Sequence, residues 1–161
     1  MRFTALALAA SAIVLSACGG GDAAKDSANT ATPATPTPAT PATATAMPAT
    51  GQVHTVRMTG TTDKFQFEPA DIKVKAGDAI KFIMVSGGPH NVAFNAADIP
   101  ADVRPQLHAN MDKTETELSS VYLINPDESI TISFAGIKPG TYAFHCTPHL
   151  MYNMKGTVTV E

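Results

Sequence analysis

The sequence predicts an all-β fold, an antiparallel β-sandwich, for the C-terminal part of the chain. Apolar and polar residues alternate in several short segments of this part, and a period of two with one apolar face is what a half-buried strand requires. Turn-forming pairs, among them Gly-Asp, Asn-Pro and Pro-Gly, separate these segments. Short strands divided by such turns are typical of a sandwich.

Five segments show the alternation, and each predicts one strand. Their intervening positions are mostly Lys, Thr, Ser or His. The apolar residues expected to face the core are, in chain order, Ile72 and Val74; Ile80, Phe82 and Met84; Ile130, Ile132 and Phe134; Tyr142, Phe144 and Cys146; and Val158 and Val160.

One long segment, residues 96–123, lacks this pattern. It contains Pro100 and Pro105 and a polar run, MDKTETELSS, so we expect it to be a crossing segment between strands. A short helix is expected within it, near residues 102–109.

The N-terminal residues predict export and anchoring. A basic start and an apolar run from Ala5 to Leu15 suit the core of a signal peptide but are too short to span a bilayer. The run ends in Leu-Ser-Ala-Cys, which resembles a bacterial lipobox and implies lipidation of Cys18. We therefore expect residues 1–17 to be a signal peptide, and the protein to be lipid-anchored to a membrane on the extracytoplasmic, periplasmic side. Gly19 after the cysteine, rather than aspartate, favours the outer membrane.

Residues 18–50 and 51–161 differ sharply in composition. The first range is rich in Ala, Thr and Pro, has almost nothing to bury, and is expected to be a disordered tether. The second is long enough for one domain with its own core, and we expect it to be a monomer.

The chain carries 11 Lys and Arg against 14 Asp and Glu, a net charge of −3, with no basic run. This balance argues against a nucleic-acid partner.

Cys146 is the second of two cysteines, and the first is committed to the lipid. A lone thiol outside the cytoplasm needs protection by burial or by a bound metal. Alternation along the strand turns Cys146 inward and His145 outward, so these two are not expected to share a site. A proline two residues later forces a turn that can bring His149 back beside Cys146, and Met154 begins the final strand. Met151, in the middle of this loop, is the weaker rival of Met154 as a sulfur donor.

A second histidine is available in the loop sequence SGGPHNVAF, where His90 follows Gly-Gly-Pro. One thiolate and two imidazoles can form a trigonal set, to which a thioether adds a weak axial bond. Such a set is that of an electron-transfer copper site, with one ion that cycles between Cu(I) and Cu(II). The predicted ligands are His90, Cys146, His149 and Met154.

Other functions explain fewer of these residues. An enzyme with Cys146 as nucleophile and His149 as base leaves His90 and Met154 without a role and lacks an orienting acid, so no catalytic activity is predicted. A structural zinc site needs four firm donors and finds only three. A copper chaperone or storage protein would use the same four ligands, and the sequence separates it poorly from a carrier.

The motif residues resemble one known family. HNVAF at 90–94, followed by CTPH at 146–149 and a methionine five residues later, is similar to the blue copper proteins (cupredoxins), in the plastocyanin and pseudoazurin branch. The resemblance covers residues 65–161, including FEPADIKVKAGDAIKF and PGTYAFHC. It implies a Greek-key sandwich and an electron carrier with the four copper ligands named above. It also implies that the amide of Asn91 contacts the thiolate sulfur and tunes the site.

Two departures from the plant members bear on the expected partners. His145 replaces a tyrosine beside Cys146, and we expect either a surface histidine or a second electron path there. Dense acidic clusters are missing from the sequence, so docking through an acidic patch is not expected. The donor and the acceptor are expected to be redox proteins near the membrane.

Overall fold

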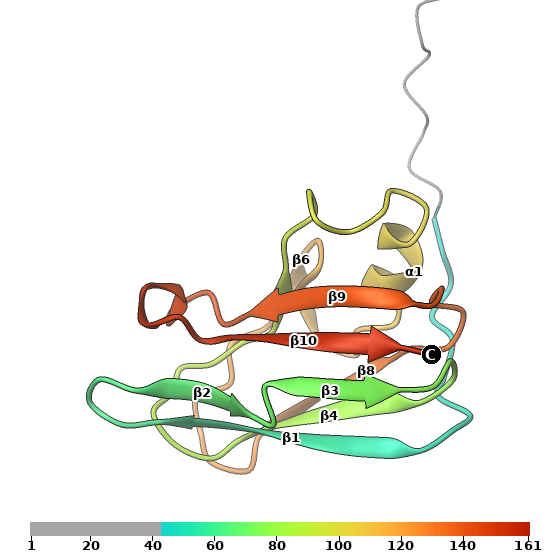
Figure 1. Ribbon diagram of the computed structural model, residues 1–161. Coiled ribbons are helices and arrows are strands. Elements are labelled where there is room, and N and C mark those ends of the chain that lie inside the picture. The colour runs from blue at the N-terminus through green and yellow to red at the C-terminus, as the bar shows by residue number, and fades with distance from the viewer. Residues whose placement is uncertain (1–42) are drawn as a thin grey trace, which may run out of the picture. The chain divides into compact units, whose positions relative to one another are not determined.

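The computed structural model describes residues 43–161, so the expected signal peptide, Cys18 and most of the expected tether lie outside the described residues. Among residues 43–161, no helix is long and apolar enough to cross a bilayer. This part of the chain forms strands, one α-helix and one 3₁₀ helix (Figure 1). Their bounds are β1 Val53–Gly60, β2 Phe65–Glu68, β3 Asp71–Val74, β4 Ala79–Met84, β5 Ala93–Phe94, α1 Arg104–Ala109, β6 Thr114–Thr116, β7 Ser119–Ser120, β8 Ser129–Ser133, β9 Gly140–His145, η1 Leu150–Tyr152 and β10 Lys155–Val160.

The strands form two sheets that pack as a β-sandwich, which confirms the predicted fold class. One sheet has the order β2-β1-β4-β8 and the other β3-β10-β9-β5-β7-β6. The pairs β1 with β4 and β3 with β10 are parallel, whereas the other pairs are antiparallel. The sheets are therefore mixed rather than wholly antiparallel. Residue alternation could not show this, because it indicates the two faces of a strand but not its direction.

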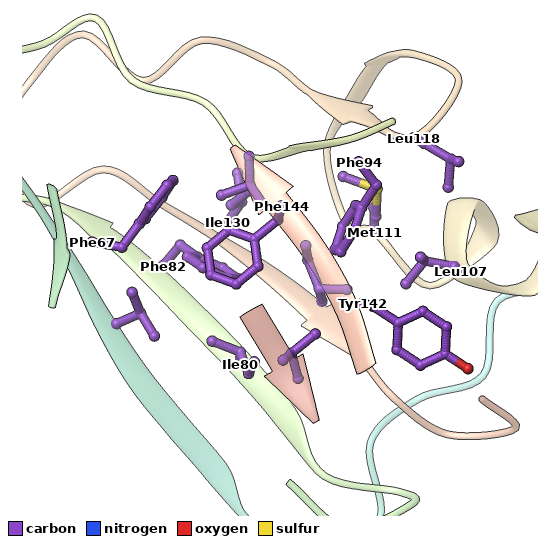
Figure 2. Close-up of a cluster of buried hydrophobic side chains, with 14 of the residues drawn as sticks. Phe67, Ile80, Phe82, Phe94, Leu107, Met111, Leu118, Ile130, Tyr142 and Phe144 are labelled. Atoms are coloured by element: carbon purple, nitrogen blue, oxygen red, sulfur yellow. The ribbon is translucent and has the colours of Figure 1, made fainter. Parts of the chain in front are cut away.

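The core lies between the sheets and contains the residues that alternation turned inward. Of the predicted core residues, all are buried except Ile72, which is half-buried because β3 is an edge strand. Figure 2 shows the aromatic centre of this core, where Phe67 and Phe82 from one sheet meet Phe144 from the other. Their rings pack edge to face at centroid distances of 4.8 to 6.0 Å, a favoured aromatic geometry. This cluster fixes β9 against the opposite sheet just before the chain reaches Cys146.

The crossing segment contains the expected helix and two short strands that alternation did not predict. The helix α1, Arg104–Ala109, buries Leu107 in the core. The strand β7 pairs with β5, and beyond it the backbone of Leu123 exchanges two hydrogen bonds with His90, at 2.8 and 3.0 Å. The segment is thus bonded along the stretch of chain that carries His90.

The last residues of the expected tether contact the domain. The carbonyl of Thr45 accepts a hydrogen bond from Gln106, and the N–H of Met47 donates to the side chain of Asn110 at 2.8 Å. The N–H of Thr50 donates to the carbonyl of Gly77 at 2.9 Å. Residues 45–50 therefore bind along the surface of the sandwich, at the end where α1 lies (Figure 1).

Candidate metal centre

The loop between β9 and β10 brings Cys146, His149 and Met154 together. Cys146 directly follows β9, and its N–H donates to the carbonyl of Met154 at 3.0 Å. The N–H groups of His149 and Met154 donate to the carbonyls of Cys146 and His149, respectively, both at 3.2 Å. Asn153 closes the loop in the left-handed conformation, with φ at 59°, which asparagine tolerates better than most residues. The turn expected from the proline at 148 is therefore confirmed.

His90 enters the site from the loop between β4 and β5. It is fully buried, and its Nε2 lies 2.8 Å from the carbonyl oxygen of Ser86. A carbonyl can only accept, so Nε2 carries the ring proton and Nδ1 keeps a free lone pair. A backbone partner of this kind orients histidines that bind metals.

The ring nitrogens of both histidines converge on the sulfur of Cys146. The sulfur lies 3.6 Å from Nδ1 of His90 and 3.4 Å from Nδ1 of His149. The three donor atoms lie within 4.8 Å of one another, and all three residues are buried. A thiolate sulfur about 2.3 Å and an imidazole nitrogen about 2.0 Å from one metal ion lie about 3.5 Å apart at a near-tetrahedral angle. The donor set therefore fits a single metal ion.

Burial separates the two methionines that the sequence left in competition. Met154 is 1% exposed, and its backbone bonds to both Cys146 and His149. Met151 is 85% exposed, on η1. Of the two methionines, Met154 is therefore the one that is buried and bonded through its backbone to the donor residues.

The electrostatics of the site favour neutral imidazoles and a thiol that ionises only beside a cation. Burial lowers the pKa of His90, although the hydrogen bond to Ser86 acts against this. Burial also lowers the pKa of His149, and His90 lowers it further. Burial raises the pKa of the Cys146 thiol, while the backbone N–H groups of Asn91 and His149 oppose that rise. Neutral rings offer lone pairs, and a bound metal ion would offset the cost of the thiolate.

The side chain of Asn91 bonds to groups other than the sulfur. It is fully buried, its Oδ1 accepts from the N–H of Thr147 at 2.7 Å, and its Nδ2 donates to the hydroxyls of Thr147 and Ser119, each at 3.2 Å. The backbone N–H of Asn91, not the side-chain amide, is the group that acts on the thiol of Cys146. The side chain instead joins the two loops that carry the donors.

Phe65 is part of the site, although it is not among the residues predicted from the sequence. Its ring stacks on that of His149, with centroids 3.8 Å apart and planes 9° from parallel, and it also contacts Tyr152. Phe65 and Phe67 are two positions apart on β2, so they share a face. The alternation of Phe65 and Phe67 could have predicted this strand, but four residues are too few to make the pattern clear.

His145 lies on the outer face of its sheet, as predicted. It is half-buried and pairs across the strands with Lys155. Burial and Lys155 both lower its pKa. Together with Lys155 it lines a surface hollow that also includes Asn95, Asp98 and Leu150.

An exposed apolar collar adjoins the donor cluster. It consists of Leu150, Met151 and Tyr152, which are 45%, 85% and 45% exposed. His149, directly before the collar, is 7% exposed. The centre is therefore closed to bulk water but lies just under an apolar surface.

Comparisons with known proteins agree with this geometry. The family model described as copper binding proteins, plastocyanin/azurin family, matches residues 54–161. The chloroplastic plastocyanin of Physcomitrium patens is 41% identical over 113 residues, which cover 70% of this chain and 61% of that protein's length. The plastocyanin of Prochlorothrix hollandica is 37% identical over 109 residues, 66% of this chain and 73% of that protein.

A solved structure shows the same fold. The oxidised form of plastocyanin from Dryopteris crassirhizoma aligns with a TM-score of 0.51 and 33% identity, and the alignment covers 66% of this chain and 99% of that one. Copper is the cofactor that the family model names, and the donor set described above suits it. The chain belongs to the plastocyanin/azurin family of copper-binding proteins.

Proposed function

We propose that this protein is a one-electron carrier with one copper ion held by His90, Cys146, His149 and Met154. The observation that carries the proposal is the convergence of two Nδ1 atoms on one buried sulfur, at 3.4 and 3.6 Å, beside a buried methionine. One thiolate, two imidazoles and a weak thioether are the ligands of an electron-transfer copper site. Copper bound there would supply a Cu(I)/Cu(II) couple.

The surrounding residues hold the donors in place. Ser86 fixes the ring of His90, Phe65 covers one face of His149, and Asn91 joins the two loops. A site that cannot move suits both oxidation states, so little reorganisation accompanies the transfer of an electron. Burial of Cys146 and Met154 excludes water from the sulfur donors.

His149 is the proposed exit for the electron. It keeps 7% exposure and adjoins the apolar collar, where a redox partner can dock without trapping water. His145, bonded covalently to Cys146 and lining a hollow that the collar borders at Leu150, is proposed as a second path. The donor and the acceptor are proposed to be redox proteins.

Anchoring and location are part of the same proposal. The Leu-Ser-Ala-Cys sequence supports lipidation at Cys18, and the composition of the following residues supports a tether on the periplasmic side of a membrane. A tethered carrier would have a raised effective concentration near membrane redox complexes.

The test is to load the metal-free full chain with Cu(II) and record visible absorption. We expect an intense blue charge-transfer band that disappears reversibly on reduction. Cys146→Ser should lose the band, while the matched change Ser120→Ala, at a buried residue outside the donor set, should keep it. A protein that stays colourless and prefers zinc would refute the proposal.

A second measurement separates a carrier from a copper chaperone or store. The loaded chain is reduced and reoxidised repeatedly in the presence of a soluble copper chelator. A carrier should keep its copper in both oxidation states, whereas a chaperone should lose it in one of them.

A further inference from the structure

We propose that Ser119 is a positioning residue for the copper centre, acting through the side chain of Asn91. The inference rests on the proposed function, because its main readout is the reduction potential of the bound copper. It assigns a role to the crossing segment, which contributes no metal ligand.

The orientation of the Asn91 amide is fixed by its partners. The atom 2.7 Å from the backbone N–H of Thr147 must be an oxygen, because that N–H can only donate. The amide nitrogen then faces two hydroxyls, and its two hydrogens match the oxygens of Ser119 and Thr147, each at 3.2 Å. Asn91 is fully buried, so no solvent competes for these bonds.

Ser119 is the only one of these partners that comes from outside the two donor loops. Asn91 follows His90, and Thr147 follows Cys146, so their hydrogen bonds join one donor loop to the other. Leu123 and Ser120 already hold the backbone of the His90 loop, but they do not bond to the side-chain amide that joins the two donor loops. Ser119 holds that amide from β7, a strand of two residues that pairs with β5.

The backbone next to Ser119 is fixed by hydrogen bonds within the sheet, so it can hold the Ser119 hydroxyl in one place. The N–H of Ser120 donates to the carbonyl of Val92 at 2.9 Å, and the hydroxyl of Ser120 accepts from the N–H of Val92 at 3.0 Å. These bonds flank Asn91 on the side away from His90. The position of the Ser119 hydroxyl is therefore set by the sheet and not by the copper loops.

Loss of the Ser119 hydroxyl should alter the sulfur of Cys146. One N–H of Asn91 would be left buried without a partner, which is costly, so the amide would turn or withdraw. The backbone N–H of Asn91, which lowers the pKa of the Cys146 thiol, would move with it. Fewer hydrogen bonds to a thiolate leave more charge on it and favour Cu(II), so the potential should fall.

The experiment compares Ser119→Ala with Ser119→Thr in the full chain. In a fixed redox buffer, the ratio of oxidised to reduced copper should rise several-fold in Ser119→Ala and return toward the parent value in Ser119→Thr, which keeps the hydroxyl. In the metal-free protein, hydrogen exchange at the amide of Thr147 should speed up only in Ser119→Ala.

Ser120→Ala is the matched control. Ser120 is buried next to Ser119, but its hydroxyl bonds only to backbone groups of Val92 and Val121. It should lower stability with a smaller effect on the potential than Ser119→Ala. Equal potentials in the parent chain and Ser119→Ala, or equal shifts in Ser119→Ala and Ser120→Ala, would overturn the inference. A parent chain without the blue band would instead overturn the proposed function.

Discussion

Single residues decide the chemistry of this centre, because the hydrogen bond that each one makes determines which donor atom stays free to bind a metal. The carbonyl of Ser86 occupies Nε2 of His90, so Nδ1 is the atom presented to Cys146. The spacing of Cys146, His149 and Met154 was predictable, because one tight turn between two strands places all three. The partner of Asn91 was not predictable, because Ser119 comes from a segment without alternation.

The stack of Phe65 on His149 should contribute to stability. Phe65→Ala removes a parallel aromatic contact with centroids 3.8 Å apart, and such pairs contribute about 1 kcal/mol beyond the area they bury. We expect the free energy of unfolding of the metal-free chain to fall by at least about 1 kcal/mol, measured by urea denaturation. Phe65→Leu keeps most of the volume without the ring face, so it should recover part of the loss. Equal stability of the alanine variant and the parent would contradict a role for the stack.

The two methionines of the copper loop should respond differently to the same substitution. Met154→Leu removes a buried thioether at nearly constant volume, a change that usually costs less than about 1.5 kcal/mol. Loss of a weak axial donor should destabilise Cu(II) and raise the reduction potential. Met151→Leu, at a residue 85% exposed, should leave the potential and the blue band unchanged. Voltammetry of the loaded variants tests this pair, and a large shift from Met151→Leu would mean that the axial donor is assigned to the wrong sulfur.

At the scale of elements, the alternation predicted five strands with one buried face but missed β1, although Val56 and Met58 of β1 face the core. Strands β4, β8, β9 and β10 have alternating burial, and their inward residues were identified correctly. Strand β6 is exposed at every position and β7 has only two residues, so neither has a pattern to find. β7 forms by pairing with β5, and β6 by pairing with β7, which is a tertiary effect that local sequence does not encode.

The segment before β1 should stabilise the domain. A chain that begins at residue 51 loses the hydrogen bonds of Thr45, Met47 and Thr50, and leaves the buried Asn110 with one acceptor bond fewer. We expect its free energy of unfolding to be lower by about 1 to 3 kcal/mol than that of a chain beginning at residue 43. Thermal and urea unfolding of the two chains measure the difference. Identical curves would show that residues 43–50 add nothing to the fold.

At the scale of the whole domain, the metal donors and the first described residues lie at opposite ends of the sandwich. His90 follows β4, while Gly77, which binds Thr50, precedes it. Cys146 follows β9, and the turn before β9 includes Ala135, whose carbonyl accepts a hydrogen bond from the same Asn110 that bonds to Met47. Figure 1 shows the same arrangement, with the β9–β10 loop on the left and the first described residues on the right. The collar is thus at the end of the domain away from residues 45–50.

The end of the domain opposite the metal donors has an ionic centre at Asp78. Its carboxylate accepts hydrogen bonds from the N–H groups of Lys75 and Gln52, and from the ring of His54 at 2.9 Å. The N–H of Lys75, the ring of His54 and the N–H of Gln52 lower the pKa of Asp78 from 3.8 to about 2. This carboxylate therefore ties β1 to the turn between β3 and β4 in its charged form.

The lowered pKa of Asp78 determines how the stability of the domain changes with pH. Because the pKa is lower in the folded state, Asp78 stabilises the domain above its ordinary value, and this contribution is lost as pH falls from about 4 to about 2. Asp78→Asn should lower the free energy of unfolding at neutral pH, and its deficit relative to the parent should shrink over that interval.

The metal-free chain is the right sample for this comparison. His90 and His149, whose pKa values are lowered from 6.5, cost stability as pH falls below that value in parent and variant alike, so the difference isolates Asp78. Since Asp78 lies far from the donors, Asp78→Asn should leave the blue band unchanged after loading, and its effect on stability should add to that of Ser119→Ala. A deficit that does not vary with pH would show that the charge of Asp78 is not what stabilises this end of the domain.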